Sequence, residues 1–236
     1  MKIGLLGYGK MGKTIEAIAI ERGHTVVWKI SRANRNELTS EILKEADVVI
    51  EFTRPEFAVE NINFCIENKV PVVVGTTGWY AEFENLKTKT LHNQASLFYA
   101  TNFSIGVNLF WKLNKQLAQL MNSNPQYKAK IEEVHHIHKL DEPSGTGITT
   151  AEGIILNHDA YSAWKLHDDS ETNLPIYSYR EGEVPGTHRV IWTSEEDKIM
   201  LEHEAFGRKG FASGAVLAAE WLKDKKGVFT MMDMLA

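Results

Sequence analysis

The amino-acid sequence predicts an α/β fold: a Rossmann-like doubly wound parallel sheet, plus a second α+β domain with a mostly antiparallel or mixed sheet. Three observations lead to this fold class. In the first half of the chain, short apolar runs alternate with amphipathic stretches, which is typical of parallel strands joined by helices. A glycine-rich turn directly follows the first apolar run. In the second half, strand-like runs succeed one another without regular crossover helices.

The first domain is expected to contain five buried strands. Each is a short run dominated by apolar residues and bounded by Gly, Pro or polar residues, as central parallel strands are. Helical spacing of apolar residues predicts helices between them, and Gly23 is expected to end the first helix. The expected strands are 2–7, 24–30, 46–52, 70–75 and 95–101, and the expected helices are 11–22, 55–68 and 79–91.

The second half is expected to form a separate domain. Residues 104–122 have the apolar spacing of one long helix, and β-rich runs follow it. The expected strands are 127–138, 174–182, 186–194 and 198–206, before an apolar helix at 211–222 that packs back on the first domain. The predicted domains are therefore residues 1–103, completed by 208–236, and residues 104–207.

Composition and charge argue against several classes of protein. With 236 residues, 43% of them hydrophobic, the chain can bury the cores of two ordinary globular domains. A net charge of −5 gives no electrostatic footprint for nucleic acid or an anionic membrane. No run approaches the ~20 apolar residues of a membrane span, and the first apolar run is too short for a signal peptide. A single cysteine, Cys65, forms no intrachain disulfide and is expected in the core, so a cytoplasmic location is expected.

The pattern G-x-G-x-x-G, from Gly7 to Gly12, lies between a predicted strand and a predicted helix. In a dinucleotide-binding turn, Gly7 permits the tight turn, Gly9 lets the backbone approach a pyrophosphate, and Gly12 lets helix and strand pack closely. The helix N-terminus then offers N–H donors to the phosphates. A glycine-rich turn without a ligand is the alternative, but the strand and helix on either side favour a nucleotide.

Two later strand ends should lie beside that turn, because ligands of open α/β sheets bind at the carboxyl ends of the strands. After the third strand, Thr53 is expected to cap the next helix in a capping box with Glu56, with Pro55 in the first turn. After the fourth strand, the glycines of GTTG (75–78) would let the main chain approach a flat ring, and the threonines offer hydroxyls and amides. An ordinary turn is the alternative for this segment.

The segment EEVHHIHKLDEPSGTGITTAE packs three histidines, a lysine and a Ser-Gly-Thr-Gly into a short span. If the strand continues to His138, His135 faces one side while His136 and His138 face the other, so all three cannot serve one small site. Lys139 begins the turn and can point into a cleft with His135. Because His and Lys are common proton donors and anion binders, these two residues are the candidates for chemistry.

Next to Lys139, the helix N-terminus predicted at 144–146 is a second anion site. A cation, a helix N-terminus and a histidine suit a carboxylate-bearing substrate that receives a proton, with hydride from a nicotinamide on the first domain. His136 and His138 could bind a metal, but no further Cys or carboxylate lies at a persuasive spacing, so no metal is expected.

The string EEVHHIHKLDEPSGTG resembles the signature of the 4-hydroxy-tetrahydrodipicolinate reductase family, the dihydrodipicolinate reductases of bacterial lysine and diaminopimelate synthesis. The resemblance covers the chain from end to end, since GYGKMG, EFTRPE, VVVGTTGW, ATNFSIGVN and RKGFASGAVLAAEWL follow in the order of the family. It implies a Rossmann domain, a mixed domain at the core of a homotetramer, and NAD(P)H-dependent reduction of a cyclic dicarboxylic imine.

The resemblance also implies roles for individual residues. His135 resembles the proton donor and Lys139 the residue that binds and polarises the substrate, with His136, Gly145 and Thr146 as further substrate ligands. The other assignments concern the cofactor: Gly7, Gly9, Lys10, Met11 and Gly12 at its phosphates, Phe52, Thr53, Gly75, Thr76, Thr77, Asn102 and Phe103 near the nicotinamide, and Arg208 at the interdomain hinge.

The residues after the second strand bear on the choice of cofactor. NAD-selective sites usually carry Asp or Glu there, which accepts from the ribose 2′-hydroxyl and repels a 2′-phosphate. Residues 26–35 contain no acid, Ser31 could donate to a phosphate, and Arg32 and Arg35 could pair with it or stack on adenine. Because the family often uses both cofactors, NADPH is expected to be preferred without excluding NADH. A solvated basic loop is the alternative.

The sequence departs from the family at residues 157–174, which look trimmed or irregular and leave tetramer contacts there open. Two other functions remain as alternatives. A different Rossmann oxidoreductase, such as an aspartate or amino-acid dehydrogenase, should lack the pair His135 and Lys139. A catalytically silent nucleotide-sensing module is disfavoured by the same intact pair.

Overall fold

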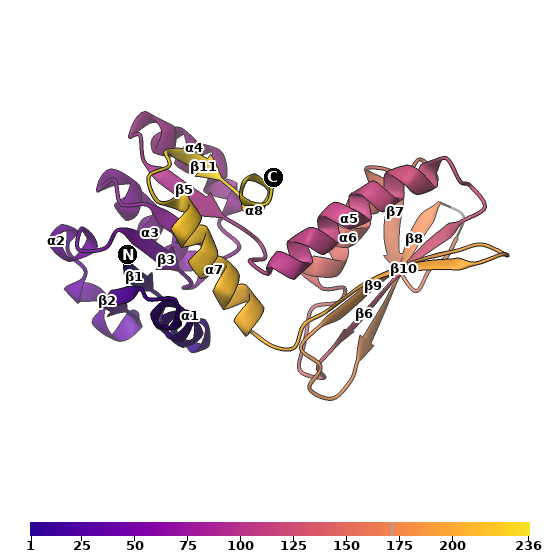
Figure 1. Ribbon diagram of the computed structural model, residues 1–236, viewed down its shortest axis with the longest axis horizontal. Helices are drawn as coiled ribbons and strands as arrows, with labels where there is room; N and C mark the ends of the chain where they lie inside the picture. Colours follow the sequence, from indigo (N-terminus) through magenta and orange to yellow (C-terminus); the bar gives the residue numbers. More distant parts are fainter. Residues whose placement is uncertain (171) are drawn as a thin grey trace. The chain divides into compact units, whose positions relative to one another are not determined.

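The computed structural model describes residues 1–170 and 172–236 (Figure 1). The chain divides into two compact units: the first is Met1–Ile105 together with Arg208–Ala236, and the second is Gly106–Gly207. The chain therefore passes from one unit to the other twice, and its C-terminal segment completes the unit that its N-terminus begins.

The first unit is built on a parallel six-stranded sheet with the order β11-β5-β4-β3-β1-β2. Its strands are β1 Lys2–Leu6, β2 Thr25–Ile30, β3 Val48–Glu51, β4 Val72–Val74, β5 Ser96–Tyr99 and β11 Gly227–Phe229. Since β1 pairs with β2 on one side and β3 on the other, the strand order reverses at β1 and β3. Ligands of open α/β sheets bind at the carboxyl ends of strands at such a reversal.

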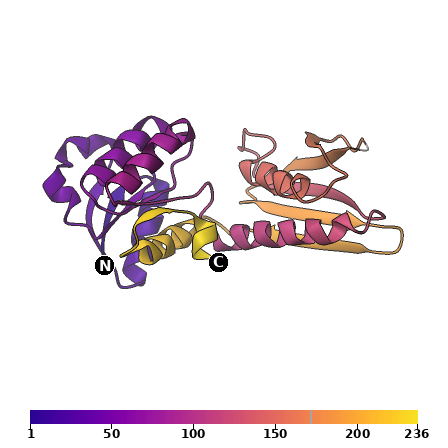
Figure 2. The same ribbon diagram turned by 90° about the horizontal axis from the view of Figure 1, so that it is seen from above.

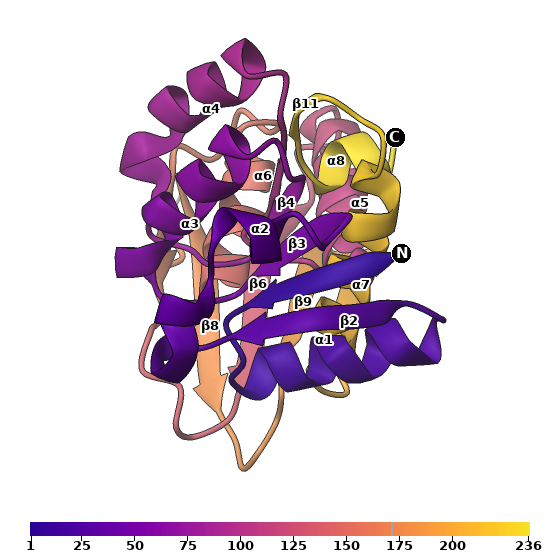
Figure 3. The same cartoon turned by 90° about the vertical axis from the view of Figure 1, so that its left-hand side faces the viewer.

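Helices cover both faces of this sheet (Figure 3). They are α1 Lys10–Glu21, α2 Ser40–Leu43, α3 Pro55–Glu67, α4 Phe83–His92, α7 Lys209–Leu222 and α8 Met231–Met234, with 3-10 turns at Arg32–Glu37 and Tyr80–Glu82. Ile15 of α1 and Val216 of α7 belong to one buried core, and Ile62 of α3 and Leu86 of α4 belong to the other. The returning helix α7 thus packs on the first sheet, as its apolar pattern predicts.

The doubly wound parallel sheet is confirmed, but the sequence misses its short elements. The five predicted strands are present, each shorter than its apolar run. The sixth strand, β11, has only three residues, all half-buried, and so gives no apolar run. Helices α2 and α8 are single turns and cannot show a helical period.

The second unit has a five-stranded sheet with the order β10-β9-β6-β8-β7. Its elements are α5 Ile105–Asn122, β6 Lys128–His135, α6 Gly145–Ile155, β7 Ala163–Leu166, β8 Asn173–Arg180, β9 Thr187–Thr193 and β10 Lys198–Glu204. β9 runs antiparallel to β6 and β10, whereas β8 runs parallel to β6 and β7. The sheet is mixed, with more parallel pairing than expected, and α6 lies in the crossover that connects the parallel strands β6 and β8.

Residues 157–174 are more regular than the sequence suggests. They contain β7, which forms an edge of the sheet beside β8. Residue 171 lies outside the described residues. β7 has only two half-buried side chains, Trp164 and Leu166, and its weak alternation hides the strand.

Helices α5 and α6 form one buried core with this sheet, and α5 runs alongside its strands (Figure 2). Phe110 and Met121 of α5, Ile154 of α6, and Ile131 and Trp192 of the strands contribute to that core. The long helix predicted from apolar spacing is confirmed as α5. Among the helices of the described residues, none combines the length and apolarity needed to cross a bilayer.

Cys65 lies in α3 with no exposed surface. Burial raises the pKa of its thiol, and a protonated, buried thiol is a poor nucleophile. The expectation of a small core residue is confirmed.

Gly214 in α7 gives a test of the packing between the returning segment and the first unit. A Cβ at this position would lie 1.7 Å from the carbonyl oxygen of Phe103, and this backbone atom cannot swing aside as a flexible side chain would. Gly214→Ala should lower the free energy of unfolding by roughly 1–3 kcal/mol or more in urea denaturation. The control is Gly210→Ala in the same helix, where the nearest atom would be 3.7 Å away. Equal stability of the two variants would contradict this packing.

Candidate active site

The glycine turn after β1 is shaped by close main-chain contacts. Gly7 has φ +95°, and a Cβ there would lie 2.0 Å from the carbonyl oxygen of Phe52. A Cβ at Gly12 would lie 2.2 Å from the carbonyl oxygen of Gly7. Around a Cβ at Gly9 nothing lies within 4 Å, and Gly9 directly precedes α1. At Gly7 and Gly12 the main chain is therefore packed too tightly for a side chain. At Gly9, where α1 begins, there is open space beside the main chain.

A cavity of about 410 Å³ adjoins this turn. Its lining includes Gly7, Tyr8, Gly9, Ser31, Arg32, Phe52 and Thr53, which follow β1, β2 and β3. In the first turn of α1, Lys10 is exposed and Met11 is half-buried. A cavity at the reversal of strand order, beside a helix N-terminus, suits the sugar and phosphates of a nucleotide.

Thr53 does not cap α3, so the expected capping box is wrong. The N-cap residue of α3 is Arg54, which makes no side-chain cap, and Pro55 is the first helical residue. The hydroxyl of Thr53 donates instead to the buried carboxyl group of Glu51, which also accepts from Asn61 Nδ2 at 3.2 Å. A buried carboxyl group needs donors, and it competes successfully for this hydroxyl.

The GTTG segment is held against the end of β3. The main-chain N–H of Thr53 donates to Oγ1 of the buried Thr76 at 2.8 Å. A Cβ at Gly75 would lie 2.1 Å from the ring of Phe52, so this glycine makes room for a ring of the protein itself. Thr77 is exposed. Of the two threonines, Thr76 therefore joins the loops and Thr77 faces outward.

Asn102 and Phe103 follow β5 and have different surroundings. Asn102 Oδ1 accepts from the main-chain N–H of Ser104 at 2.9 Å. Phe103 is 2% exposed, and its ring centroid lies 5.7 Å from that of Phe52. Phe103 thus supports the cavity wall from behind. Arg208 is exposed at the N-cap position of α7.

Three cations lie on or just after β2. Lys29 Nζ is 2.9 Å from Glu16 Oε1, and an Arg35 guanidinium nitrogen is 2.8 Å from Glu60 Oε1. Arg32 is exposed at the cavity and, in the part of the chain that the structure describes, has no ion-pair partner. Arg32 is therefore the cation of this group whose charge is not already matched.

Ser31 has a structural role in the same loop. Its hydroxyl accepts from the main-chain N–H of Ala33 at 3.3 Å and donates to Asn34 Oδ1 at 3.0 Å. Ser31 is the N-cap of the 3-10 turn that carries Arg32. The hydroxyl expected to face a phosphate thus holds the loop in place.

In the second unit, β6 ends at His135, earlier than the sequence predicts. His136 and His138 lie in the turn after it, so the strand alternation expected through His138 is wrong. β8, the parallel neighbour of β6, ends at Arg180, opposite His135, so the regular ladder stops there, although the main-chain N–H of Ile137 still donates to the carbonyl oxygen of Gly182 at 3.1 Å. The His138 side chain is 71% exposed, whereas His136 is half-buried and His135 is buried.

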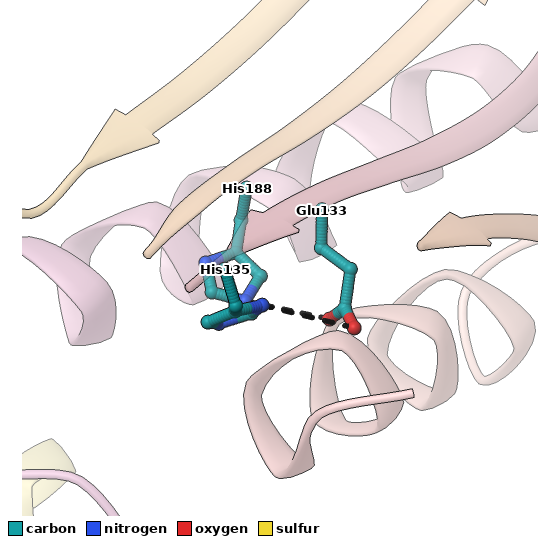
Figure 4. Close-up of side chains that lie close together, drawn as sticks. All are labelled: Glu133, His135 and His188. Atoms are coloured by element: carbon teal, nitrogen blue, oxygen red, sulfur yellow. Dashed lines mark ion pairs between the residues drawn. The ribbon is translucent and has the colours of Figure 1, made fainter. Parts of the chain in front are cut away.

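The buried carboxylate of Glu133 lies beside the imidazoles of His135 and His188 (Figure 4) and accepts hydrogen bonds from the start of α6 and from β8. Ser144 donates to it twice, from its main-chain N–H at 2.9 Å and its hydroxyl at 2.5 Å, and the Ser178 hydroxyl donates at 2.6 Å. His188 Nε2 lies 3.6 Å from the carboxylate, and His135 Nδ1 lies 3.9 Å from it. Burial alone would raise the pKa of Glu133, but hydrogen bonds from His188, Ser144 and Ser178 outweigh it and hold the pKa at about 2.

Sequence reasoning singled out neither Glu133 nor His188. Glu133 stands two residues before His135 on the same face of β6, and this strand alternation was the available signal. His188 comes from β9, and only the antiparallel register of β6 and β9 sets it opposite Glu133. No local pattern could have paired these two residues.

The pKa of His135 is lowered to about 4. Burial is the main cause, and the charges of His188, Lys139 and Arg180 add to it, while Glu133 acts in the opposite direction. The imidazole of His135 is therefore neutral near pH 7 in the free protein. A negatively charged ligand beside it would favour protonation.

Ligand atoms of Glu133, His135 and His188 lie within 4.8 Å of one another, which is close enough for a shared metal ion. Both carboxylate oxygens of Glu133 already accept short hydrogen bonds from serine donors. A metal ion would have to displace those donors, so the three residues fit a hydrogen-bonded cluster better than a metal centre.

The turn after β6 places Lys139 beside this cluster. Lys139 Nζ pairs with both carboxylate oxygens of Asp141, at 2.7 and 2.8 Å. Arg180 holds the turn from β8, donating to the carbonyl oxygen of Asp141 at 2.7 Å and to that of Lys139 at 3.2 Å. The positive charge of Lys139 thus stays near His135, held by a partner that is itself 60% exposed.

The N-terminus of α6 completes the site. Ser144 is its N-cap, and the serine hydroxyl accepts from the main-chain N–H of Gly147 at 3.0 Å. Gly145 is exposed, with nothing within 4 Å of a Cβ position, and Thr146 is half-buried. An open helix N-terminus and a lysine together can bind carboxylate groups, and a histidine beside them can transfer a proton.

Comparisons with known proteins agree along the whole chain. The family model "Dihydrodipicolinate reductase, N-terminus" matches residues 1–103, and "Dihydrodipicolinate reductase, C-terminus" matches residues 106–235. A 4-hydroxy-tetrahydrodipicolinate reductase of Christiangramia forsetii is 45% identical over 236 residues, which is 100% of this chain and 98% of the relative.

Solved structures show the same fold. A dipicolinate-bound dihydrodipicolinate reductase from Paenisporosarcina sp. TG-14 superposes with a TM-score of 0.83 at 22% identity, over 99% of each chain. An aspartate dehydrogenase from Thermotoga maritima has a TM-score of 0.50 at 12% identity, over 95% of this chain and 97% of that one. At these identities the likeness concerns the fold alone.

Proposed function

Because the chain belongs to the dihydrodipicolinate reductase family, we infer that it catalyses the NAD(P)H-dependent reduction of 4-hydroxy-tetrahydrodipicolinate to tetrahydrodipicolinate in lysine and diaminopimelate synthesis. The observation that carries this function is the 45% identity to a curated reductase along the entire chain. The presence of both His135 and Lys139 beside an open helix N-terminus supports it over a silent nucleotide-sensing module.

The first unit fits a dinucleotide cofactor. Gly7 and Gly12 occupy positions that no side chain could enter, and the open backbone at Gly9 lies where a pyrophosphate could approach the amides of α1. NAD(P)H bound there would supply a hydride. Of the other assigned residues, Thr77 is exposed, while Thr53, Thr76 and Phe103 hold the walls of the cavity.

The second unit fits a cyclic dicarboxylate. Lys139 and the amides at Gly145 and Thr146 would bind the carboxylates, with His136 at the edge of the site, and Lys139 would exchange its contact with Asp141 for one with the substrate. Two added negative charges would raise the pKa of His135, so that its imidazole becomes the proton donor in the complex.

We also propose that the protein is a cytoplasmic homotetramer that assembles through the second unit. β10 is an edge strand, and its Ile199 and Met200, on opposite faces of the strand, are 41% and 50% exposed, so a partner subunit pairing with this edge would cover apolar side chains. Sedimentation equilibrium of the purified protein should give four times the mass of the chain. A monomer at micromolar concentration would reject this assembly.

The reaction itself is tested by following oxidation of NADPH and NADH with substrate formed in situ from pyruvate and aspartate semialdehyde. Turnover that requires both precursors is expected. Turnover with aspartate and NAD(P)⁺ instead would favour an aspartate dehydrogenase, and nucleotide binding without turnover of either would favour a sensing module.

His135→Ala should lower kcat by about 10²- to 10⁴-fold and change KM little, because general acid catalysis acts in the transition state. His138→Ala is the matched control, since this exposed histidine lies in the same segment and pairs with Glu183 on the surface. Thermal unfolding of both variants checks that they are folded. Near-normal turnover of His135→Ala would remove this residue from the mechanism.

We propose that NADPH is preferred and that Arg32 binds its 2′-phosphate. Arg32→Ala should then raise KM for NADPH by about 10-fold or more, as expected for loss of a hydrogen bond to a charged group, and leave KM for NADH nearly unchanged. Arg35→Ala is the control, because Arg35 is already paired with Glu60. Equal losses for both cofactors, or a clear preference of the wild type for NADH, would reject this role of Arg32.

A further inference from the structure

A row of polar side chains crosses the sheet of the second unit beneath the proposed site. In the strand register, His203 of β10 lies opposite His188 of β9, His188 lies opposite Glu133 of β6, and Glu133 lies opposite Ser178 of β8. Glu133 has no exposed surface, and His188 is 4% exposed. A buried charge at the centre of such a row destabilises the folded state unless hydrogen-bond donors replace the water that it loses.

The carboxylate of Glu133 also sits directly beneath the first turn of α6. A Cβ at Gly147 would lie 2.5 Å from Glu133 Oε2, so this turn can come so close only because a glycine stands there. Both donors of Ser144, the N-cap residue, point at the carboxylate. The helix end that would receive a substrate carboxylate is therefore fastened to β6 through Glu133.

From this juxtaposition we propose that Glu133 is a positioning residue for the reaction: its buried carboxylate holds the N-terminus of α6, the imidazole of His188 and the proton donor His135 in one fixed arrangement. The proposal rests on the proposed function, since it concerns the same site. Glu133 does not touch the substrate. It acts through its hydrogen bonds to Ser144, which fix the position of the N-terminus of α6, and through its negative charge beside His135.

The charge matters because most groups around His135 oppose its protonation. His188 from β9, Arg180 from β8 and Lys139 from the turn all disfavour the imidazolium, and His203 lies behind His188. Of the negative groups, Asp141 is bound to Lys139, and Glu133 faces His135 Nδ1 at 3.9 Å. Removing the charge of Glu133 leaves the cations without this counter-charge and makes His135 harder to protonate.

Glu133→Gln keeps the size of the side chain and removes its charge. If Glu133 positions the site, kcat should fall roughly 10- to 100-fold, because a displacement of about 1 Å at a reacting group costs that much. Activity that depends on protonated His135 is lost as pH rises through the pKa of that histidine. The alkaline fall of kcat should therefore move to lower pH in Glu133→Gln. The ratio of wild-type kcat to variant kcat should increase as pH rises.

Two further measurements separate positioning from a purely structural role. The inhibition constant of dipicolinate, measured against substrate, should increase, because the helix N-terminus is displaced, while the Kd of NADPH should stay unchanged. Glu152→Gln is the control, a loss of one carboxylate on the exposed side of α6. It should match the wild type in kcat, inhibition constant and pH profile.

Several outcomes would overturn the proposal. Wild-type kcat and pH profile in a folded Glu133→Gln would do so, and so would a uniform drop in kcat with no shift of the alkaline limb and no change for dipicolinate. If Glu133→Gln does not fold, Ser178→Ala removes one donor to the carboxylate at 2.6 Å while the charge of Glu133 stays, so kcat should fall by a smaller factor and the alkaline limb should not move to lower pH. Wild-type kcat, or an alkaline limb moved to lower pH, in a folded Ser178→Ala would reject the proposal. Inactive wild-type protein would instead reject the proposed function.

Discussion

A carboxylate removed from water must be met by hydrogen-bond donors, and this requirement organises the second unit around Glu133. Its donors come from the start of α6 and from β8, so satisfying one charge fixes three elements relative to one another. Glu51, buried at the end of β3, shows the effect of fewer donors. Its Oε2 has no partner among the described residues, and burial raises its pKa. The same residue type is thus held ionised in one unit and shifted toward the neutral form in the other.

The site of the first unit consists mainly of main-chain groups, whereas the site of the second unit consists of side chains. This difference determines what each site indicates about function. In the first unit, the important groups are main-chain ones: the tight approach of Gly7 and Gly12 and the open amides after Gly9. Such a turn serves many dinucleotide-dependent enzymes and says little about the substrate. In the second unit the groups are side chains, and in the proposed mechanism His135 and Lys139 would determine which molecule binds and which proton moves.

Features with a local cause could be predicted from the sequence. The glycine turn, five strands of the parallel sheet and α5 each depend on residues close together in the chain, and the sequence predicts all of them. The capping box at Thr53 was wrong because a buried carboxyl group, invisible to a local pattern, took its hydroxyl. The end of β6 was misplaced because it is set by the length of β8. The pairing of Glu133 with His188 depends on strand register, which no short motif specifies.

In the proposed mechanism, the charges around His135 explain why its protonation would wait for the substrate. In the free protein, Lys139 is paired with Asp141, and Arg180 contacts Ser178, which in turn donates to Glu133. The site is therefore close to electrical balance with His135 neutral. When a dicarboxylate binds, Lys139 can exchange the carboxylate of Asp141 for one of the substrate, and the released Asp141 is already largely in water. The negative charge that remains is compensated most directly by proton uptake at His135, since an anion within about 4–6 Å raises the pKa of an imidazole. In the proposed mechanism, the histidine would thus become an acid only when the molecule that takes its proton is bound.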